Sequence, residues 1–132
     1  MAYLLDTNIL IYFFKEAGQV RNRLMDQRDT DICLCTPVLS ELLTGAYKSQ
    51  RPNSQLARVA AVQRRFQTLS LDLVSADWAA RTRAHLEQAG TPIGPIDTLI
   101  AGIALAHDLT LVTRNTREFE RVPGLKIENW YD

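Results

Sequence analysis

Three acidic residues in this chain stand at or near the starts of predicted helices, and their types and spacing suit chemistry at a shared site. Asp6 directly follows the apolar run "AYLL", Glu41 lies one turn into the helical stretch "VLSELLTGAYKS", and Asp97 opens the apolar stretch "DTLIAGIALAHD". Thr113 and Asn115 follow the strand-like "LTLV". Because open parallel sheets bind ligands beyond the carboxyl ends of their strands, we expect these side chains to converge on one sheet edge.

Carboxylates gathered in this way repel one another unless a cation or protons neutralise them. Oxygen ligands without His or Cys suit Mg²⁺ or Mn²⁺, and such an ion can orient water for in-line attack on phosphorus. Each acid also has an ordinary structural explanation. Asp6 and Asp97 could cap helices, and Glu41 could be a common helix residue, although the leucines beside it favour partial burial.

The elements that must position these acids alternate along the chain. Strands are expected at residues 2–6, 31–37, 70–75, 109–113 and 125–130, and helices at 7–14, 19–27, 38–49, 56–69, 75–90 and 97–108. Pro37 suits a first helical turn, and Asn53 or Ser54 is the expected cap after the loop at 50–55. Strands that are apolar throughout and alternate with helices predict one α/β domain over residues 1–132, with a parallel sheet covered on both faces.

Composition sets broad limits on function. The chain has 132 residues, 46% hydrophobic and 23% charged, with 15 basic and 15 acidic side chains. This balance argues against a nonspecific nucleic-acid coat protein, but it allows a locally basic face. The start "MAYLLD" lacks the basic region of a signal peptide, and no apolar run approaches the roughly 20 residues that span a bilayer, so a cytoplasmic location without membrane contact is expected.

Rival sites are less well supported by the residues. A zinc site from Cys33, Cys35, His85 and His107 has no paired metal motif, and the two cysteines are expected to be reduced core residues. An aspartyl-phosphate mechanism would usually require a second Asp where Asn8 stands, and no Gly-rich phosphate loop is present. A catalytically silent binding module would usually have lost one of the acids.

With these residues in place, the chain resembles the PIN-domain ribonucleases, specifically the VapC-type toxins of bacterial toxin–antitoxin pairs. The resemblance is carried by "LLDTNILIY", "SELLTGAYKSQRP", "GTPIGPIDTLIAGIALAHDLTLVTRNTREFERV" and "ENWYD", which together span nearly the whole chain. It implies a three-layer α/β/α fold around a central parallel sheet.

The resemblance also implies roles for individual residues. Asp6, Glu41 and Asp97 match the catalytic, metal-binding acids, while Thr7, Asn8 and Thr113 match polar positions that support the site. Many PIN domains carry a fourth acid where this chain has Asn115, so the number of metal ions stays open, with Glu118 as a candidate substitute.

The implied activity is an endoribonuclease that requires Mg²⁺ or Mn²⁺ and inhibits translation, with initiator tRNA as one candidate target. Glu41 and Asp97 are both candidates for the general base. A VapB-type antitoxin and a second copy of the chain, forming a homodimer, are the implied partners. Among the cations, Lys48, Arg51, Arg114 and Arg117 are candidates for RNA contacts, whereas the arginines at 64, 65, 81 and 83 fit solvated helix faces.

Overall fold

The computed structural model describes all residues from 1 to 132 as five strands and seven α-helices. The strands are β1 (Tyr3–Leu5), β2 (Ile32–Cys35), β3 (Gln67–Leu69), β4 (Thr110–Val112) and β5 (Ile127–Glu128). The helices are α1 (Thr7–Lys15), α2 (Val20–Met25), α3 (Thr36–Lys48), α4 (Pro52–Arg65), α5 (Leu73–Gln88), α6 (Pro95–Ala106) and α7 (Thr116–Phe119), with a short 3₁₀ turn at Asp29–Asp31.

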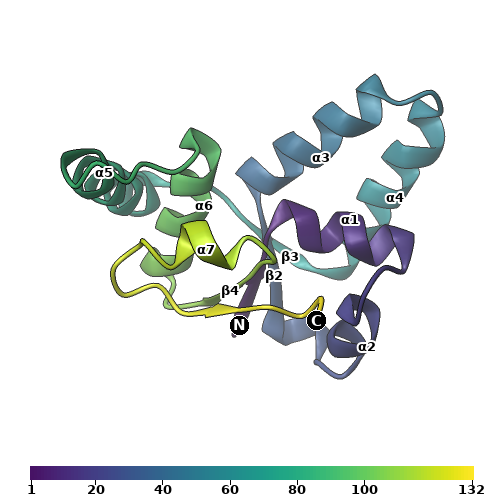
Figure 1. Cartoon of the computed structure of the whole chain (residues 1–132). Helices are drawn as coiled ribbons and strands as arrows, with labels where there is room; N and C mark the ends of the chain where they lie inside the picture. The colour runs from purple at the N-terminus through teal and green to yellow at the C-terminus, as the bar shows by residue number, and fades with distance from the viewer.

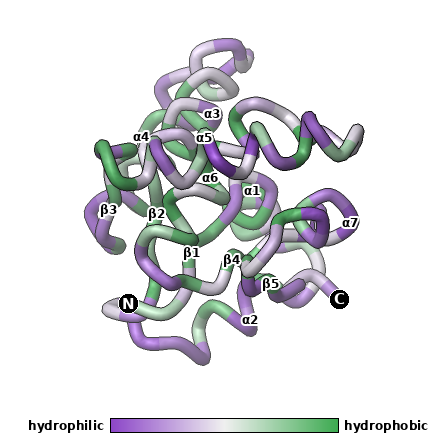
Figure 2. The backbone as a smooth tube through the Cα atoms, turned by 90° about the vertical axis from the view of Figure 1, so that its left-hand side faces the viewer, coloured by the Kyte–Doolittle hydropathy of each residue, from purple (hydrophilic) through white to green (hydrophobic).

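All five strands pair in parallel, in the order β3-β2-β1-β4-β5. Figure 1 shows α6, backed by α5, on one side of this sheet and α1, α2 and α4 on the other, and Figure 2 shows the strands in order across the sheet. The predicted parallel sheet between two helical layers is therefore confirmed. The chain moves outward from β1 to β2 and β3, then returns to the other side of β1 for β4. The switch point where ligands bind in such sheets consequently lies between β1 and β4.

The sheet and its helices share one continuous apolar core of 28 buried residues. Leu4 and Leu111 in the central strands are completely inaccessible to solvent, because helices cover both faces of the sheet. Trp130, only 1% exposed, closes the core near the chain's end, where its ring meets that of Tyr3 at 4.9 Å between centroids. No helix combines the length and the apolar character that crossing a bilayer requires.

The strand predicted at residues 70–75 is wrong, and so is the helix predicted to continue to residue 69. The chain leaves α4 at Arg65, forms β3 at Gln67–Leu69 and enters α5 at Leu73. Alternating apolar and polar residues in "SLDLVS" imitate a strand, but Asp72 instead accepts a hydrogen bond from the Ser75 amide and caps α5. Leu73 and Val74 remain 90% and 60% exposed, which shows that the local alternation does not report burial here.

Two other boundaries also differ from the predictions. Helix α4 begins at Pro52, so Asn53 and Ser54 lie inside its first turn and do not cap it. Proline is well suited to the first turn because its missing amide hydrogen has no helical partner there. The segment after β4, for which no helix was predicted, contains the short helix α7, and the last strand, predicted at 125–130, is only two residues long.

Helices α5 and α6 pack closely around Gly102. A Cβ atom at this position would lie 2.7 Å from the Ala79 amide nitrogen and 2.7 Å from the Ser75 carbonyl oxygen. Because both are backbone atoms of α5, they cannot move aside as a flexible side chain would. Glycine therefore allows α5 to lie directly against α6, which carries Asp97.

We predict that Gly102→Ala lowers the free energy of unfolding by at least about 1 kcal/mol, since overpacking outweighs the better helix propensity of alanine. Urea denaturation followed by circular dichroism measures the change. Gly45→Ala in α3 is the matched control, because a Cβ there meets nothing within 4 Å. It should raise stability by about 0.5–1 kcal/mol. Equal changes in the two variants would contradict the packing argument.

Candidate active site

Asp6 occupies the junction between β1 and α1, beside the switch point of the sheet. Its Oδ1 accepts a hydrogen bond from the Thr7 amide at 2.8 Å, and its Oδ2 accepts one from the Thr113 hydroxyl at 2.7 Å. The side chain is only 4% exposed, and Asp6 is also the N-cap of α1. Capping and a functional role are thus compatible, because the cap fixes the carboxylate at the sheet edge.

Glu41 approaches the same edge from α3. Its Oε1 accepts a hydrogen bond from the Thr7 hydroxyl at 2.5 Å. Thr7 therefore contacts both acids, Asp6 through its amide and Glu41 through its hydroxyl. Glu41 is half-buried, as the surrounding leucines predicted.

Asp97 joins these two carboxylates from the first turn of α6. Burial raises its pKa to about 6, and the negative charges of Asp6, Glu41 and Glu118 contribute further. Burial also raises the pKa of Asp6, against the opposing effect of the hydrogen bonds from Thr113 and Thr7. The charges of the three predicted acids thus act on one another, as their predicted convergence on one sheet edge suggested.

Glycine at position 94 leaves space for the Asp97 side chain. A Cβ atom there would lie 3.2 Å from Asp97 Oδ2, so a larger residue would press on the carboxylate. Gly94 was not among the predicted site residues. The only local signal was its place in the Pro/Gly loop before α6.

Asn115, where a fourth acid was expected, connects Thr113 to Glu118. The Asn115 amide donates to Thr113 Oγ1 at 2.9 Å, and its side-chain nitrogen donates to Glu118 Oε2 at 3.2 Å. Helix α7 thereby brings Glu118 near the other carboxylates, since its charge acts on Asp97. A role for Glu118 in place of the missing acid stays a prediction.

The remaining supporting residue, Asn8, contacts the segment that follows β4. Its Oδ1 accepts a hydrogen bond from the Arg114 amide at 3.4 Å, so it ties α1 to the segment that follows β4. Behind the site, Cys33 and Cys35 are both free and buried, as expected of core residues. Burial raises the pKa of Cys35 to about 12, so this thiol stays protonated at neutral pH and is a poor metal ligand.

The four candidate RNA-binding cations separate into two groups. Lys48 lies seven residues beyond Glu41, or about 10 Å along the helix, and Arg51 follows it at the turn between α3 and α4. Figure 1 shows this turn at the end of the helical hairpin that projects away from the sheet. Arg114 and Arg117 are exposed and follow β4, on the side of the molecule that carries the site.

The donor chemistry of the site fits a hard divalent cation. Its charged groups are all carboxylates, and none of them forms an ion pair with Lys, Arg or the N-terminus. No group of three or more His, Cys, Asp or Glu side chains is arranged to hold a metal ion in this conformation, however. Two of the acids are instead bonded to Thr7 and Thr113. The site therefore has donor types and unneutralised charge that suit a hard cation, but no preformed cage for one.

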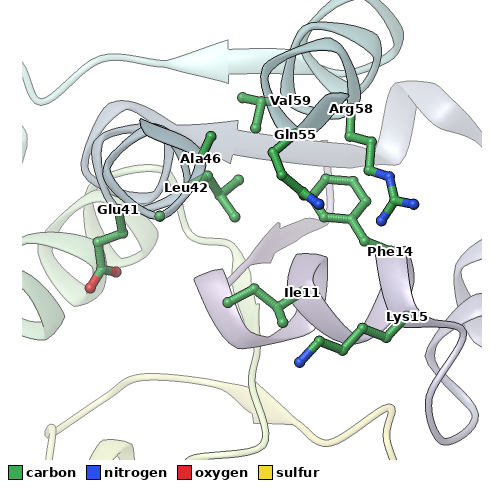
Figure 3. A pocket seen from close by; sticks show the side chains of 10 residues that line it. Ile11, Phe14, Lys15, Glu41, Leu42, Ala46, Gln55, Arg58 and Val59 are labelled. Carbon is green, nitrogen blue, oxygen red and sulfur yellow. The ribbon is translucent and has the colours of Figure 1, made fainter. Parts of the chain in front are cut away.

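A pocket opens beside Glu41, between α1, α3 and α4 (Figure 3). Its apolar lining comes from Ile11, Phe14, Leu42, Ala46 and Val59, and its polar lining from Lys15, Glu41, Gln55 and Arg58. A second group of exposed apolar side chains lies on α5, where Leu73, Val74 and Trp78 are 90%, 60% and 41% exposed. The expected homodimer stays a prediction.

Comparisons with known proteins connect this geometry to a family. A family model described as PIN domain matches residues 3–125. Two proteins named tRNA(fMet)-specific endonuclease VapC are similar to this chain: that of Shigella flexneri is 40% identical over 131 residues and that of Salmonella typhimurium 38% over 130. Both alignments cover 98% of this chain and 98% of the relative.

Solved structures give the same result. The chain matches VapBC2 from Rickettsia felis bound to a promoter DNA fragment with a TM-score of 0.91 and 34% identity, covering 98% of this chain and 99% of the other. It matches DNA-bound VapBC from Salmonella typhimurium with a TM-score of 0.91 and 39% identity, covering 98% of both chains.

Burial and repulsion at Asp97 should make the stability of the metal-free protein depend on pH. The folded-state pKa of about 6 lies above the unfolded value of 3.8, so the stabilising contribution is complete below pH 3.8 and is lost as the pH rises through 6. We predict that Asp97→Asn stabilises the protein at pH 7.5 by about 1–2 kcal/mol, a figure reduced for the partial exposure of the carboxylate.

Urea denaturation in EDTA at pH 7.5 and pH 4.0 measures this effect, and the gain should be much smaller at pH 4.0. Asp26→Asn, which changes an exposed carboxylate at the end of α2, is the control and should alter stability little at either pH. An Asp97→Asn variant that is no more stable than the parent at pH 7.5 would show that the site carries no such repulsion.

Proposed function

Since the chain belongs to the PIN-domain family, we propose that it is the toxin of a type II toxin–antitoxin pair and acts as a metal-dependent endoribonuclease. The observation that carries this proposal is the cluster of three carboxylates from separate elements at one sheet edge. Their charges raise the pKa of Asp97, and no basic side chain neutralises them. The names and structures of its relatives support the same reading.

Asp6, Asp97 and Glu41 would hold the metal ion, for which Mg²⁺ and Mn²⁺ are the candidates because all the ligands are hard oxygens. When bound, the ion would lower the pKa of a water molecule and stabilise charge that develops on the phosphate. The chain itself fixes the position of the acids. Thr113 and the Thr7 amide hold the two oxygens of Asp6, and the Thr7 hydroxyl holds Glu41 Oε1.

A general base must accept the proton of the attacking water. We propose Glu41 Oε2 for this role, because Oε1 already accepts the bond from Thr7 and so orients the second oxygen. Asp97 is the alternative acceptor. Cleavage of the phosphodiester at the bond to the 3′ oxygen would leave a 3′-hydroxyl and a 5′-phosphate.

The substrate we propose is RNA, with initiator tRNA as the first target to test. The two relatives named tRNA(fMet)-specific endonuclease VapC support this choice over nearly the full chain. Loss of initiator tRNA would inhibit translation and would place the action of the protein in the cytoplasm.

The partner we propose is a VapB-type antitoxin. The solved relatives from Rickettsia felis and Salmonella typhimurium are VapBC assemblies, which supports a partner of the same kind. The pocket between α1, α3 and α4 offers an apolar surface for it, with Glu41 in its wall (Figure 3). An occupant of this pocket would cover Glu41 and so block the active site.

We predict that Asp6→Asn and Asp97→Asn each reduce RNA cleavage at least about hundredfold, since each removes a charged ligand and leaves the shape of the side chain. Cleavage of tRNA by purified protein, read by sequencing RNA 5′ ends, measures the effect. EDTA should stop the parent enzyme, and Mg²⁺ or Mn²⁺ should restore it. Asp26→Asn is the control. Undiminished cleavage by the Asp6→Asn, Asp97→Asn double variant in EDTA would disprove the metal model.

We also predict that Ile11→Glu weakens antitoxin binding at least about tenfold, because a charge would be buried in the apolar part of the pocket. Isothermal titration with the cognate antitoxin measures the affinity. Met25→Glu is the matched control, since Met25 is 66% exposed at the end of α2 and lies outside the pocket. Equal affinity of the two variants would exclude this pocket as the antitoxin site.

A further inference from the structure

One arginine beside the active site is held between two tyrosine rings. The guanidinium carbon of Arg114 lies 3.6 Å from the ring centroid of Tyr131 and 5.4 Å from that of Tyr12. Its Nη1 donates a hydrogen bond to the Tyr12 hydroxyl at 3.2 Å. We call these three side chains the Arg114 cluster.

The rest of the chain fixes the cluster in place. The two tyrosine rings meet edge to face, with 4.7 Å between their centroids. The Gln19 amide donates to the Tyr131 carbonyl at 2.8 Å, and the Asn129 side chain accepts from the Tyr131 amide at 2.8 Å. Gly18 permits this contact, because a Cβ there would lie 2.6 Å from the Tyr131 carbonyl oxygen. The guanidinium therefore has a defined position despite its exposure.

The backbone of Arg114 is joined to residues that hold the carboxylate site. Arg114 follows Thr113, which bonds to Asp6, and the Arg114 amide bonds to Asn8 in the first turn of α1. An open polar hollow is lined by Asn8, Tyr12, Arg114 and Asn115. A strand of RNA at the carboxylates would therefore pass next to the exposed donors of Arg114.

Arg114 forms no ion pair within the chain, although the negative charge of Asp132 acts on it. Five other arginine side chains form ion pairs with carboxylates, but Arg114 forms none. The nearby Asp132 carboxylate instead accepts a hydrogen bond from the Asn129 side chain. Stacking on aromatic faces orients a guanidinium and leaves its remaining N–H groups free for an oxyanion.

We propose that the Arg114 cluster binds a phosphate of the RNA substrate next to the one that is cleaved. This inference rests on the proposed ribonuclease function and deepens it by naming a substrate subsite. The cluster anchors the strand at a fixed distance from the carboxylates, so its main effect is on substrate affinity. Tyr12 and Tyr131 are positioning residues that act through Arg114.

The test measures RNA binding in the Asp6→Asn background, so that cleavage does not interfere. A fluorescein-labelled single-stranded RNA of twelve nucleotides is titrated by anisotropy over a range of NaCl concentrations. We expect Arg114→Ala to weaken binding about tenfold and to reduce the magnitude of the salt slope by about 0.7, the value for one lost phosphate contact. Arg114→Lys should restore most of the slope, because it restores the charge.

Arg64→Ala is the control, since it removes the same charge from an exposed site on α4 and should alter neither quantity. With Asp6 intact, Arg114→Ala should raise KM and change kcat little. The midpoint of thermal unfolding of each variant, compared with that of the parent protein, identifies any general loss of stability.

If Arg114 has a purely structural role, Arg114→Ala should lower the thermal midpoint of unfolding but bind RNA with the same affinity and salt slope as Arg64→Ala. This result would overturn the proposal. The proposal would also be overturned if Arg114→Ala left RNA binding unchanged and weakened antitoxin binding. The cluster would then be part of the antitoxin-binding surface. The parent protein could also bind RNA without ever cleaving it. If Arg114→Ala then still reduces the salt slope, the phosphate site is supported and the proposed nuclease activity is refuted.

Discussion

The buried carboxylate of Asp6 is the constraint on which the rest of the site depends. A carboxylate that is 4% exposed is costly to ionise unless hydrogen bonds replace the lost water. Here each oxygen accepts one such bond, from the Thr7 amide and from the Thr113 hydroxyl. The Thr7 amide comes from the turn into α1, whereas the Thr113 hydroxyl reaches Asp6 because β1 and β4 are paired neighbours. The sheet topology thus determines the electrostatics of the site.

The same topology brings further negative charge to this edge and leaves it unbalanced. Helix α3 presents Glu41 and α6 presents Asp97, while α7 carries Glu118 nearby. A protein selected for stability alone would place a lysine or arginine among these acids. The chain instead uses two threonines, which orient the carboxylates without neutralising them. A bound cation would therefore relieve the repulsion between the acids. The close packing of α5 on α6 at Gly102 holds the helix of Asp97 against this repulsion.

The acids could be predicted from the sequence because each belongs to a local pattern. Asp6 ends an apolar strand, so parallel pairing places it at the carboxyl edge of the sheet, and Asp97 begins an apolar helix after a Pro/Gly loop. The positions of three other side chains depend on the path of loops and of the last residues of the chain, which a hydrophobic pattern does not predict. These residues are Gly94, Glu118 and Tyr131.

The local pattern misled at one element. The alternation in "SLDLVS" suggested a strand, although the Asp72 cap determines a helix there. Local hydrogen-bonding chemistry decided this case. The role of Lys48, about 10 Å from Glu41 along α3, stays a prediction.

The separation of Arg114 from the acids is the last feature that the function requires. An arginine that paired with one of these carboxylates would neutralise part of the site and occupy it. The Tyr12 hydroxyl and the face of Tyr131 hold the guanidinium in another position, and the bond from the Arg114 amide to Asn8 fixes the backbone. Both charges therefore persist side by side in the free protein. The negative one remains available to a metal ion and the positive one to a phosphate, as the cleavage of a polyanion by a cation-dependent site demands.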